Sequence, residues 1–301
     1  MAKSAPNANI IVEAELKEHI SGLERRVGGD VLSFIGPLAF GADVVLRGAV
    51  EELHDTKRRG KKLSVLLESV GGYIGVAERM VALFRHHYQR VEFIIPDAAM
   101  SAGTVLVMSG DAIHMDYFSV LGPIDPQIQR PDGKMVPALG YLAKYEELVK
   151  KSSEGKLSPV EAAYLLERFD PGELHQFEQA RDLTIDLLKD WLVRYKFRNW
   201  KKTERHGGKV TRAMKVERAG EIARQLNETR LWHSHARGIS MEVLRRKLNL
   251  RIEDFGQNND LKESISTYYA LLQDYKGKLS HDGVVHTRLR YIPLNFFTRR
   301  G

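Results

Sequence analysis

Ser101 is the residue of this 301-residue chain that is best placed to act as a nucleophile. It lies in the run DAAMSAGT (97–104), where alanine and glycine allow a tight turn and the close approach of a substrate carbonyl. The run follows a predicted strand and begins a predicted helix, so the N–H group of Ala102 would lie where the helix dipole favours negative charge. A serine at such a junction can be a nucleophile or a simple helix N-cap, and the spacing alone leaves both interpretations open.

A second feature suited to acyl transfer is the turn SVGG, which ends the preceding predicted strand. Gly72 could supply a backbone N–H group there, and Gly71 would allow the backbone conformation that the turn needs. Together with Ala102, Gly72 could form an oxyanion hole, in which each donor contributes roughly 3–4 kcal/mol. A serine beside two such donors indicates a serine hydrolase, and we favour a peptidase.

A serine nucleophile also needs a base, and two kinds of residue could provide it. Lys144, in GYLAK, could act as the base if it were desolvated, although it could equally be a solvated helix lysine. His233 and His235, in WHSHAR, are the alternatives, with Asp125 as a possible orienting carboxylate; a packed histidine pair would explain them as well. No third ligand accompanies the two histidines, so we expect neither a metal site nor a cofactor.

The elements that must position these residues alternate between strand and helix. Three short runs typical of buried parallel strands each end in a turn: Leu63–Leu67, Val91–Ile95 and Ala112–Met115, the first two followed by helical spacing. Val31–Ile35 is a further predicted strand, and helices are predicted over 10–26, 42–56, 75–87 and 101–108. Repeated β-α-β units predict an α/β fold with a mostly parallel sheet and right-handed crossovers.

The chain changes character after Asp125. Residues 130–135 read as a polar turn, and 138–197 are strongly helical, with the SP and DP pairs at Pro159 and Pro171 marking helix starts. Further helices are predicted over 216–226, up to Leu248, and over 262–279. We therefore expect an N-terminal arm (1–30), a core (31–256) and a C-terminal helical and basic tail (257–301).

Composition excludes several functional classes. The chain has no cysteine, so disulfides, thiolate zinc sites and cysteine nucleophiles are impossible, and a reducing cytosol is a suitable compartment. No run approaches the roughly 18 apolar residues of a transmembrane helix. The N-terminus lacks the apolar region of a signal peptide, so a cytoplasmic protein without membrane contact is expected.

Positive charge is concentrated between Arg194 and Arg218. This block holds ten Lys and Arg residues against Glu204 and Glu217, a net charge of +8, while the whole chain has +7. Such a block can contact nucleic acid. Because no recognised nucleic-acid motif accompanies it, a solvated loop is the favoured interpretation, and nucleic acid stays a possible partner.

The motifs SVGG, AAMSAG and LGPIDPQ together resemble the Clp protease/crotonase superfamily, and within it the serine dehydrogenase proteinase family, which is grouped with the signal peptide peptidase A-like enzymes. The resemblance covers Ser33–Gln127 and continues more loosely to WHSHARGI and LNLRIEDFG. It implies a Clp protease/crotonase-like spiral of β-α-β units with helical C-terminal additions. It also implies Ser101 as nucleophile, an oxyanion hole from Gly72 and Ala102, and assembly into a homo-oligomer, as a trimer or ring.

The chain departs from the family pattern in the residue that would act as general base. Clp proteases carry their base histidine where this chain has GPID (122–125), whereas signal peptide peptidase A-like enzymes use a lysine further along. Lys144 lies at a matching separation, with Lys150 and Lys151 just beyond, so a Ser101–Lys144 dyad acting on peptides or proteins is our hypothesis. The rival functions are a crotonase-like acyl-CoA enzyme and a non-catalytic oligomeric scaffold that uses the basic block.

Overall fold

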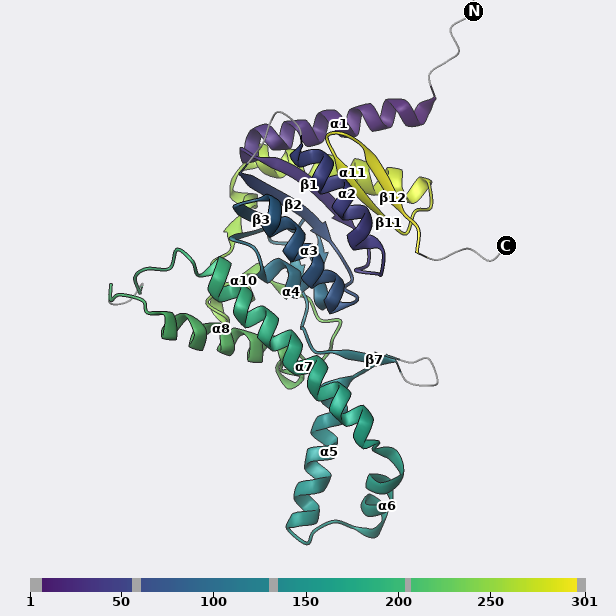
Figure 1. The fold of residues 1–301 in the computed structure, drawn as a ribbon, viewed down its shortest axis with the longest axis vertical. Coiled ribbons are helices and arrows are strands. Elements are labelled where there is room, and N and C mark those ends of the chain that lie inside the picture. Colours follow the sequence, from purple (N-terminus) through teal and green to yellow (C-terminus); the bar gives the residue numbers. More distant parts are fainter. Residues whose placement is uncertain (1–6, 56–60, 130–134, 204–206, 297–301) are drawn as a thin grey trace, which may run out of the picture.

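The computed structural model describes residues 7–55, 61–129, 135–203 and 207–296. Its centre is a seven-stranded sheet with the order β10-β5-β3-β2-β1-β11-β12 (Figure 1). In chain order these strands are β1 (Asp30–Ile35), β2 (Lys62–Glu68), β3 (Arg90–Ile94), β5 (Ala112–Met115), β10 (Glu253–Asp254), β11 (Gly283–Thr287) and β12 (Tyr291–Leu294). All pairings from β10 to β1 are parallel, and only β11 and β12 run antiparallel to their neighbours. The predicted mostly parallel α/β sheet is confirmed.

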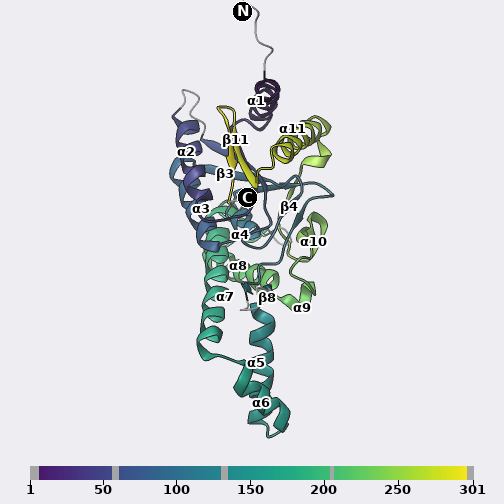
Figure 2. The same ribbon diagram turned by 90° about the vertical axis from the view of Figure 1, so that its right-hand side faces the viewer.

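Helices cover both faces of this sheet, which Figure 2 shows edge-on. One face packs against α2 (Ala42–His54), α3 (Ile74–His87) and α4 (Ala102–Met108), and the other against α1 (Ala8–Val27) and α11 (Asn259–Lys278). Strand β2 is buried on both faces, which explains its mostly apolar sequence: Val65 and Leu67 join the first core, while Leu66 joins the second. Each such fully buried side chain stabilises the fold by about 1.5–3 kcal/mol.

Three further helices form an arm that projects from the body at the bottom of Figure 1. They are α5 (Ala138–Ser153), α6 (Pro159–Arg168) and α7 (Pro171–Trp191). Pro159 and Pro171 occupy first-turn positions, capped by Ser158 and Asp170, as the sequence predicted. Helix α7 continues into a π-helical turn, η1 (Leu192–Lys196), and α8 (Arg212–Asn227) packs against α7.

A second, small sheet connects the body to this helical region. It has the order β4-β6-β9 and consists of β4 (Ala98–Ala99), β6 (Val120–Leu121) and β9 (Ile239–Ser240). After β6 the chain forms the hairpin of β7 (Gln127–Gln129) and β8 (Met135–Pro137). Short elements complete the description: α9 (Thr229–Trp232), α10 (Met241–Arg246) and η2 (Phe255–Gln257).

The structure differs from the expectations chiefly at the C-terminus. Residues 283–294, expected within a helical and basic tail, form β11 and β12, and β11 pairs with β1 in the central sheet. The expected polar turn at 130–135 lies almost wholly outside the described residues, as do 297–301 at the end of the expected tail. Helix α10 ends at Arg246, close to the expected end at Leu248.

Within the described ranges, no helix combines the length and the apolar character that crossing a bilayer requires. The same ranges contain no cluster of three or more His, Cys, Asp or Glu side chains arranged to hold a metal ion.

A buried histidine in the second core makes stability sensitive to acid. The Tyr268 hydroxyl lies 2.8 Å from the Ser33 hydroxyl and 2.6 Å from Nδ1 of His286, and all three side chains are buried. Burial lowers the pKa of His286 to about 3. The unfolded chain takes up a proton on this imidazole near pH 6.5, whereas the folded protein does not, so stability is lost as pH falls from about 6.5 toward 3.

We therefore expect the His286→Phe variant to depend less on pH than the wild type. Between pH 7 and pH 4 the wild type should lose about 3 kcal/mol more unfolding free energy than the variant, since only the wild type carries the titrating imidazole. Urea titrations of both proteins at the two pH values measure this difference. Equal losses would show that His286 is protonated in the folded protein as readily as in the unfolded chain.

Candidate active site

Ser101 lies at the sharp junction between β4 and α4, in a backbone conformation that L-residues rarely adopt. Its φ is 52° and its ψ is −122°, outside the allowed left-handed helical region. Such a conformation costs about 1–3 kcal/mol and persists only where the surroundings enforce it. A serine whose only function was to cap α4 would have no need of this conformation, and its side chain accepts no capping hydrogen bond.

The segment after β2 is what enforces this conformation. The N–H of Ser69 donates to the carbonyl of Ala98 (3.0 Å), and the N–H of Met100 donates to the carbonyl of Ser69 (2.8 Å). At Gly71 a Cβ would lie 2.8 Å from both the Ser101 Cβ and the Met100 carbonyl oxygen. Only glycine fits there, and its φ of 98° also suits glycine.

Two backbone N–H groups adjoin Ser101 and have no acceptor among the described residues: those of Gly72 and Ala102. The strand-like segment that carries Gly72 is held by Leu38, whose N–H donates to the Gly71 carbonyl (2.8 Å) and whose carbonyl accepts from the Tyr73 N–H (2.9 Å). Ala102 is the first residue of α4, where the helix dipole is positive. These unpaired donors can stabilise an oxyanion.

Thr104 links the elements of the site from inside, although the sequence gave no reason to single it out. Its buried hydroxyl oxygen lies 2.7 Å from the Ala99 carbonyl and 2.9 Å from the Gly122 carbonyl, and it accepts from the Gly122 N–H at 2.9 Å. One hydroxyl on α4 therefore fixes the ends of β4 and β6 relative to each other.

The small sheet brings two more candidate residues to the edge that carries Ser101. Strands β4 and β6 are parallel and β9 is antiparallel to β6, so the end of β4, the end of β6 and the start of β9 share one edge. Ser101 follows β4, Asp125 follows β6, and His235 precedes β9. Glycines 122 and 238 permit close approach of the chains there, since added Cβ atoms would lie 2.8 Å from Met100 and 2.9 Å from Val120.

His235 and Asp125 are in direct contact. His235 Nδ1 lies 2.9 Å from Asp125 Oδ1, and the Gln127 side-chain amide donates to Oδ2 at 3.1 Å. The Asp125 side chain is buried, while that of His235 is 23% exposed. A carboxylate can only accept, so Nδ1 carries the shared proton, and in the neutral imidazole the lone pair is on Nε2. This is the tautomer that a general base requires.

The other two candidate bases lie in different surroundings. Lys144 is on α5 of the arm, 47% exposed, with its Nζ 3.0 Å from the Glu147 carboxylate. A lysine that acts as a base is normally desolvated, which Lys144 is not. His233 is exposed and adopts a φ of 63° in the turn after α9. Neither residue has a described hydrogen bond to Asp125.

Apolar side chains and a partly buried carboxyl flank the turn that carries Gly71 and Gly72. Phe40 and Tyr73 stack with ring centroids 4.1 Å apart although they are 72% and 55% exposed, and Val70, just before Gly71, is also exposed. On the inner side, Glu68 accepts from the Tyr269 hydroxyl at 2.7 Å and also from Gln273. Burial raises the pKa of Glu68, although the Tyr269 hydrogen bond acts in the opposite direction.

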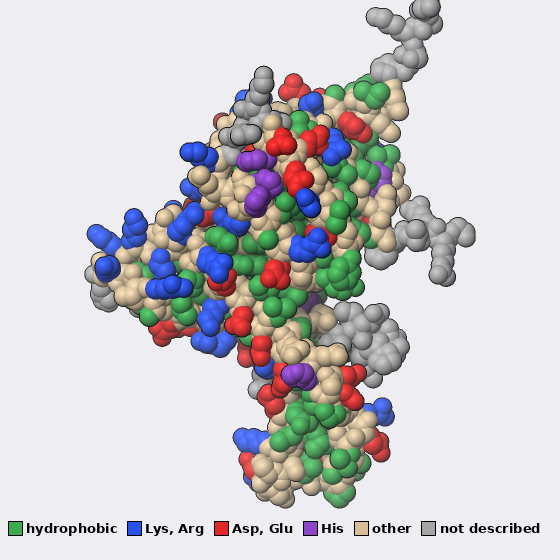
Figure 3. Space-filling view, viewed as in Figure 1, with side chains coloured by type: hydrophobic (Ala, Val, Ile, Leu, Met, Phe, Trp, Pro, Cys, Tyr) green, Lys and Arg blue, Asp and Glu red, His purple; other side chains and the backbone are tan. Residues whose placement is uncertain are grey.

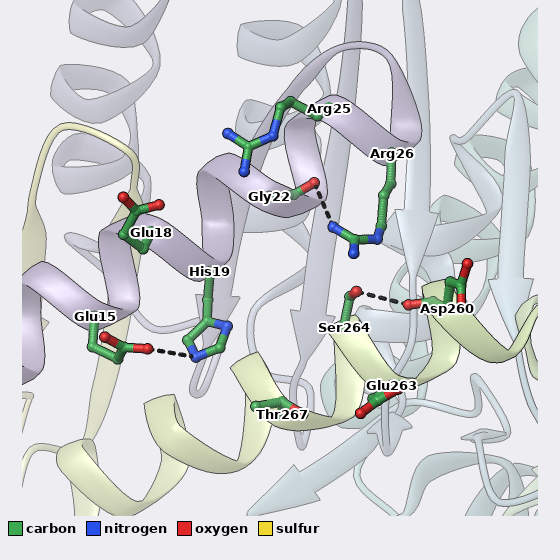
Figure 4. A pocket seen from close by; sticks show the side chains of 10 residues that line it. All are labelled: Glu15, Glu18, His19, Gly22, Arg25, Arg26, Asp260, Glu263, Ser264 and Thr267. Carbon is green, nitrogen blue, oxygen red and sulfur yellow. Dashed lines mark hydrogen bonds and ion pairs between the residues drawn. The ribbon is translucent and has the colours of Figure 1, made fainter.

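A groove lies elsewhere on the surface, between α1 and α11 (Figure 4). This groove has a volume of about 470 Å³ and is lined by charged and polar side chains that partly satisfy one another, such as Glu15 with His19. None of its lining residues belongs to the site around Ser101. We therefore place the candidate active site at the β4–α4 junction and not in this groove.

Comparison with protein families identifies one match. The family model described as ClpP-like SDH-type serine proteinase matches residues 51–213, more than half of the chain. The matched range includes Gly71, Gly72, Ser101 and Lys144, whereas His235 lies beyond it.

Two proteins of Methanocaldococcus jannaschii are similar to parts of the chain. Uncharacterized protein MJ1495 is 27% identical over 128 residues, which are 42% of this chain and 39% of that protein. Uncharacterized protein MJ0137 is 33% identical over 82 residues, 27% of this chain and 29% of that protein. The chain thus spans well under half the length of these relatives.

Among solved structures, two of the 1510-N membrane-bound stomatin-specific protease are similar. One has a TM-score of 0.45 at 12% identity and covers 89% of this chain and 92% of that one. The other, in complex with a substrate peptide, has a TM-score of 0.46 at 13% identity and covers 89% and 87%.

Proposed function

Because the chain belongs to the ClpP-like SDH-type serine proteinase family, we propose that it hydrolyses peptide bonds through an acyl-enzyme formed on Ser101. The observation that carries this proposal is the strained conformation of Ser101 beside the unpaired N–H groups of Gly72 and Ala102. Together they supply a nucleophile on a sharp strand-to-helix turn and donors for the charge that develops during acyl transfer.

His235 is the base we favour, and its support is the contact with the buried Asp125 carboxylate at the strand ends that also carry Ser101. In this mechanism Nε2 of His235 accepts the proton of the Ser101 hydroxyl as the oxygen attacks the substrate carbonyl, and returns it to the leaving amine. Asp125 stabilises the imidazolium that forms, with Gln127 holding its second oxygen. Water then releases the acyl group with the same base. Lys144, the base that spacing favoured, is the rival for this role.

A fluorophosphonate probe tests the nucleophile directly, because it reacts with an activated serine whatever the base or the substrate. We expect one adduct by intact mass on the wild type and none on Ser101→Ala. A folded wild-type protein that takes up no probe, or a label retained by Ser101→Ala, would contradict the proposal. Binding of a CoA ester by an unlabelled protein would favour the crotonase-like alternative instead.

The oxyanion hole can be tested at Gly72. A Cβ there would lie 2.5 Å from the Leu38 carbonyl oxygen, and φ is 143°, so Gly72→Ala must displace the segment and its N–H group. Loss of one donor should lower kcat by about 10²–10³-fold. Gly75→Ala is the matched control, since a Cβ at Gly75 would meet nothing within 4 Å in the first turn of α3. Equal kcat values for the two variants would exclude Gly72 as a donor.

Assembly into a homo-oligomer stays a prediction, as does the cytoplasmic location. The prediction of a homo-oligomer is supported by large apolar side chains that α6 exposes, with Val160 80% and Leu166 84% exposed. Exposed apolar surface of this kind often marks a protein–protein contact.

A further inference from the structure

The basic block that the proposed peptidase does not use contains an ordered hairpin. The Val210 N–H donates to the Lys201 carbonyl (2.9 Å) and the Thr203 N–H to the Gly208 carbonyl (2.9 Å), with Lys202 paired to Lys209 across the two strands. We call the described parts of this hairpin, 201–203 and 207–210, the basic hairpin. It joins η1 to α8 and projects at the left of Figure 1. The block is solvent-exposed, as the sequence favoured, and its described part is paired by the bridge between Lys202 and Lys209.

The residues on either side of the hairpin are fixed to the body. Arg198 lies 2.5 Å from the Asp111 carboxylate, and Lys215 Nζ donates to the Arg198 carbonyl at 3.1 Å. Phe197 packs against the main core and contacts the Trp200 ring at a centroid distance of 5.6 Å. The hairpin is thus presented from a rigid support.

The cations of the hairpin are not neutralised by the protein. Lys201, Lys202 and Lys209 are exposed and form no ion pair within the described ranges. Lys202 and Lys209 stand directly opposite each other, an arrangement that destabilises a strand pair. An anion that bridges the two ammonium groups would remove this repulsion.

The adjoining start of α8 adds to the positive field. Its first turn contains Arg212 and Lys215 and no acidic residue, so two cations lie at the positive end of a 16-residue helix. Arg212 is exposed and has no described ion pair. Figure 3 shows Lys and Arg side chains gathered over this projecting region. The unpaired positive charge on the basic hairpin and on the start of α8 favours binding of an extended polyanion over binding of a single small anion.

We propose that the basic hairpin and the start of α8 bind double-stranded DNA, with the paired segments 201–203 and 207–210 lying along the major groove and their lysines contacting phosphates. A two-stranded ribbon has strands about 4.8 Å apart and fits a B-form major groove about 12 Å wide. The corresponding groove of duplex RNA is too narrow for side chains to enter. A membrane is the less suitable anionic surface, because no exposed large apolar side chain is described between 194 and 218 to insert into it.

Fluorescence anisotropy with a labelled DNA duplex tests the proposal on the full-length chain. Four unpaired cations predict that log Kobs falls against log salt with a slope of about −3 to −4 between about 50 and 200 mM salt. Lys201→Gln/Lys202→Gln/Lys209→Gln should reduce the slope by about 3 and weaken binding at least about tenfold. The matched control, Lys17→Gln/Lys150→Gln/Lys156→Gln, removes the same charge from exposed positions elsewhere and should bind as the wild type does.

Several outcomes would overturn the proposal. These are an equal effect of the two triple variants, equal affinity for duplex RNA, or binding to phosphatidylserine vesicles with none to DNA. Circular dichroism of both triple variants establishes that they fold. The Ser101→Ala variant should bind DNA as tightly as the wild type, so this test is independent of whether the chain is a peptidase.

Discussion

Ser101→Ala should abolish peptide hydrolysis while leaving the protein folded. Removal of a serine nucleophile typically lowers kcat by about 10⁴–10⁶-fold, with only the oxyanion donors and binding contributing to what remains. Those donors should stay in place, because Gly72 is held by Leu38 and Ala102 by α4. Hydrolysis of a casein or peptide-library substrate by wild type and variant measures the loss. Unchanged hydrolysis would remove Ser101 from the mechanism.

The backbone at Ser101 provides a second measurement that a capping serine would not produce. Alanine retains the strain of φ 52° and ψ −122°, whereas glycine relieves about 1–3 kcal/mol of it at an entropic cost of about 0.5–1 kcal/mol. Ser101→Gly should therefore unfold at a higher urea concentration than Ser101→Ala, by about 1 kcal/mol. A less stable glycine variant would mean that Ser101 is not strained in solution.

The sequence predicted the first half of the fold well because its signals there are local. Strand β5 (Ala112–Met115) has the predicted bounds, and β1, β2 and β3 differ from theirs by only one residue at either end. Strands β1, β2 and β3 are each followed by a helix that packs on the sheet (α2, α3 and α4), so apolar runs and turn residues suffice to place strand and helix.

The small sheet and the C-terminal strands lacked such signals. Two-residue strands such as β4 and β6 are too short to show any periodicity. Strand β11 pairs with β1 from more than 240 residues away, placing Val285 opposite Phe34. No local pattern around VVHT indicates that partner, and the polar residues on either side made the segment resemble a tail.

The residues of the candidate site differ in the same way: some have a local sequence signal, and others meet only in the folded chain. Gly71, Gly72 and Ala102 could be proposed as oxyanion-hole residues from the sequence because each belongs to a turn with its own sequence signature. The sequence named His235 and Asp125 as alternatives but could not show that they touch, because they are 110 residues apart and meet only through the pairing of β6 with β9. Gln127 and Thr104 carried no signal at all, since their roles arise from contacts that exist only in the folded chain.

Replacing His235 by alanine should have the second large effect and should decide the identity of the base. If Nε2 of His235 takes the proton of Ser101, His235→Ala should lower kcat by about 10⁴–10⁶-fold. Asp125→Asn should lower it by about 10⁴-fold, because an amide in that place favours the wrong imidazole tautomer. Added imidazole should restore part of the activity of His235→Ala, which a merely structural role would not allow.

Lys144→Ala is the comparison that makes the His235 result interpretable. If His235 is the base, Lys144→Ala should change kcat no more than Lys150→Ala does, since both lysines are exposed on α5 and Lys150 has no proposed role. A loss in Lys144→Ala alone, with His235→Ala active, would transfer the role to Lys144. That result would require α5 to move, because Lys144 would have to leave Glu147 and the solvent before its ammonium group could give up a proton. The arm would then be part of the catalytic machinery, whereas a His235 base leaves the arm free for another role.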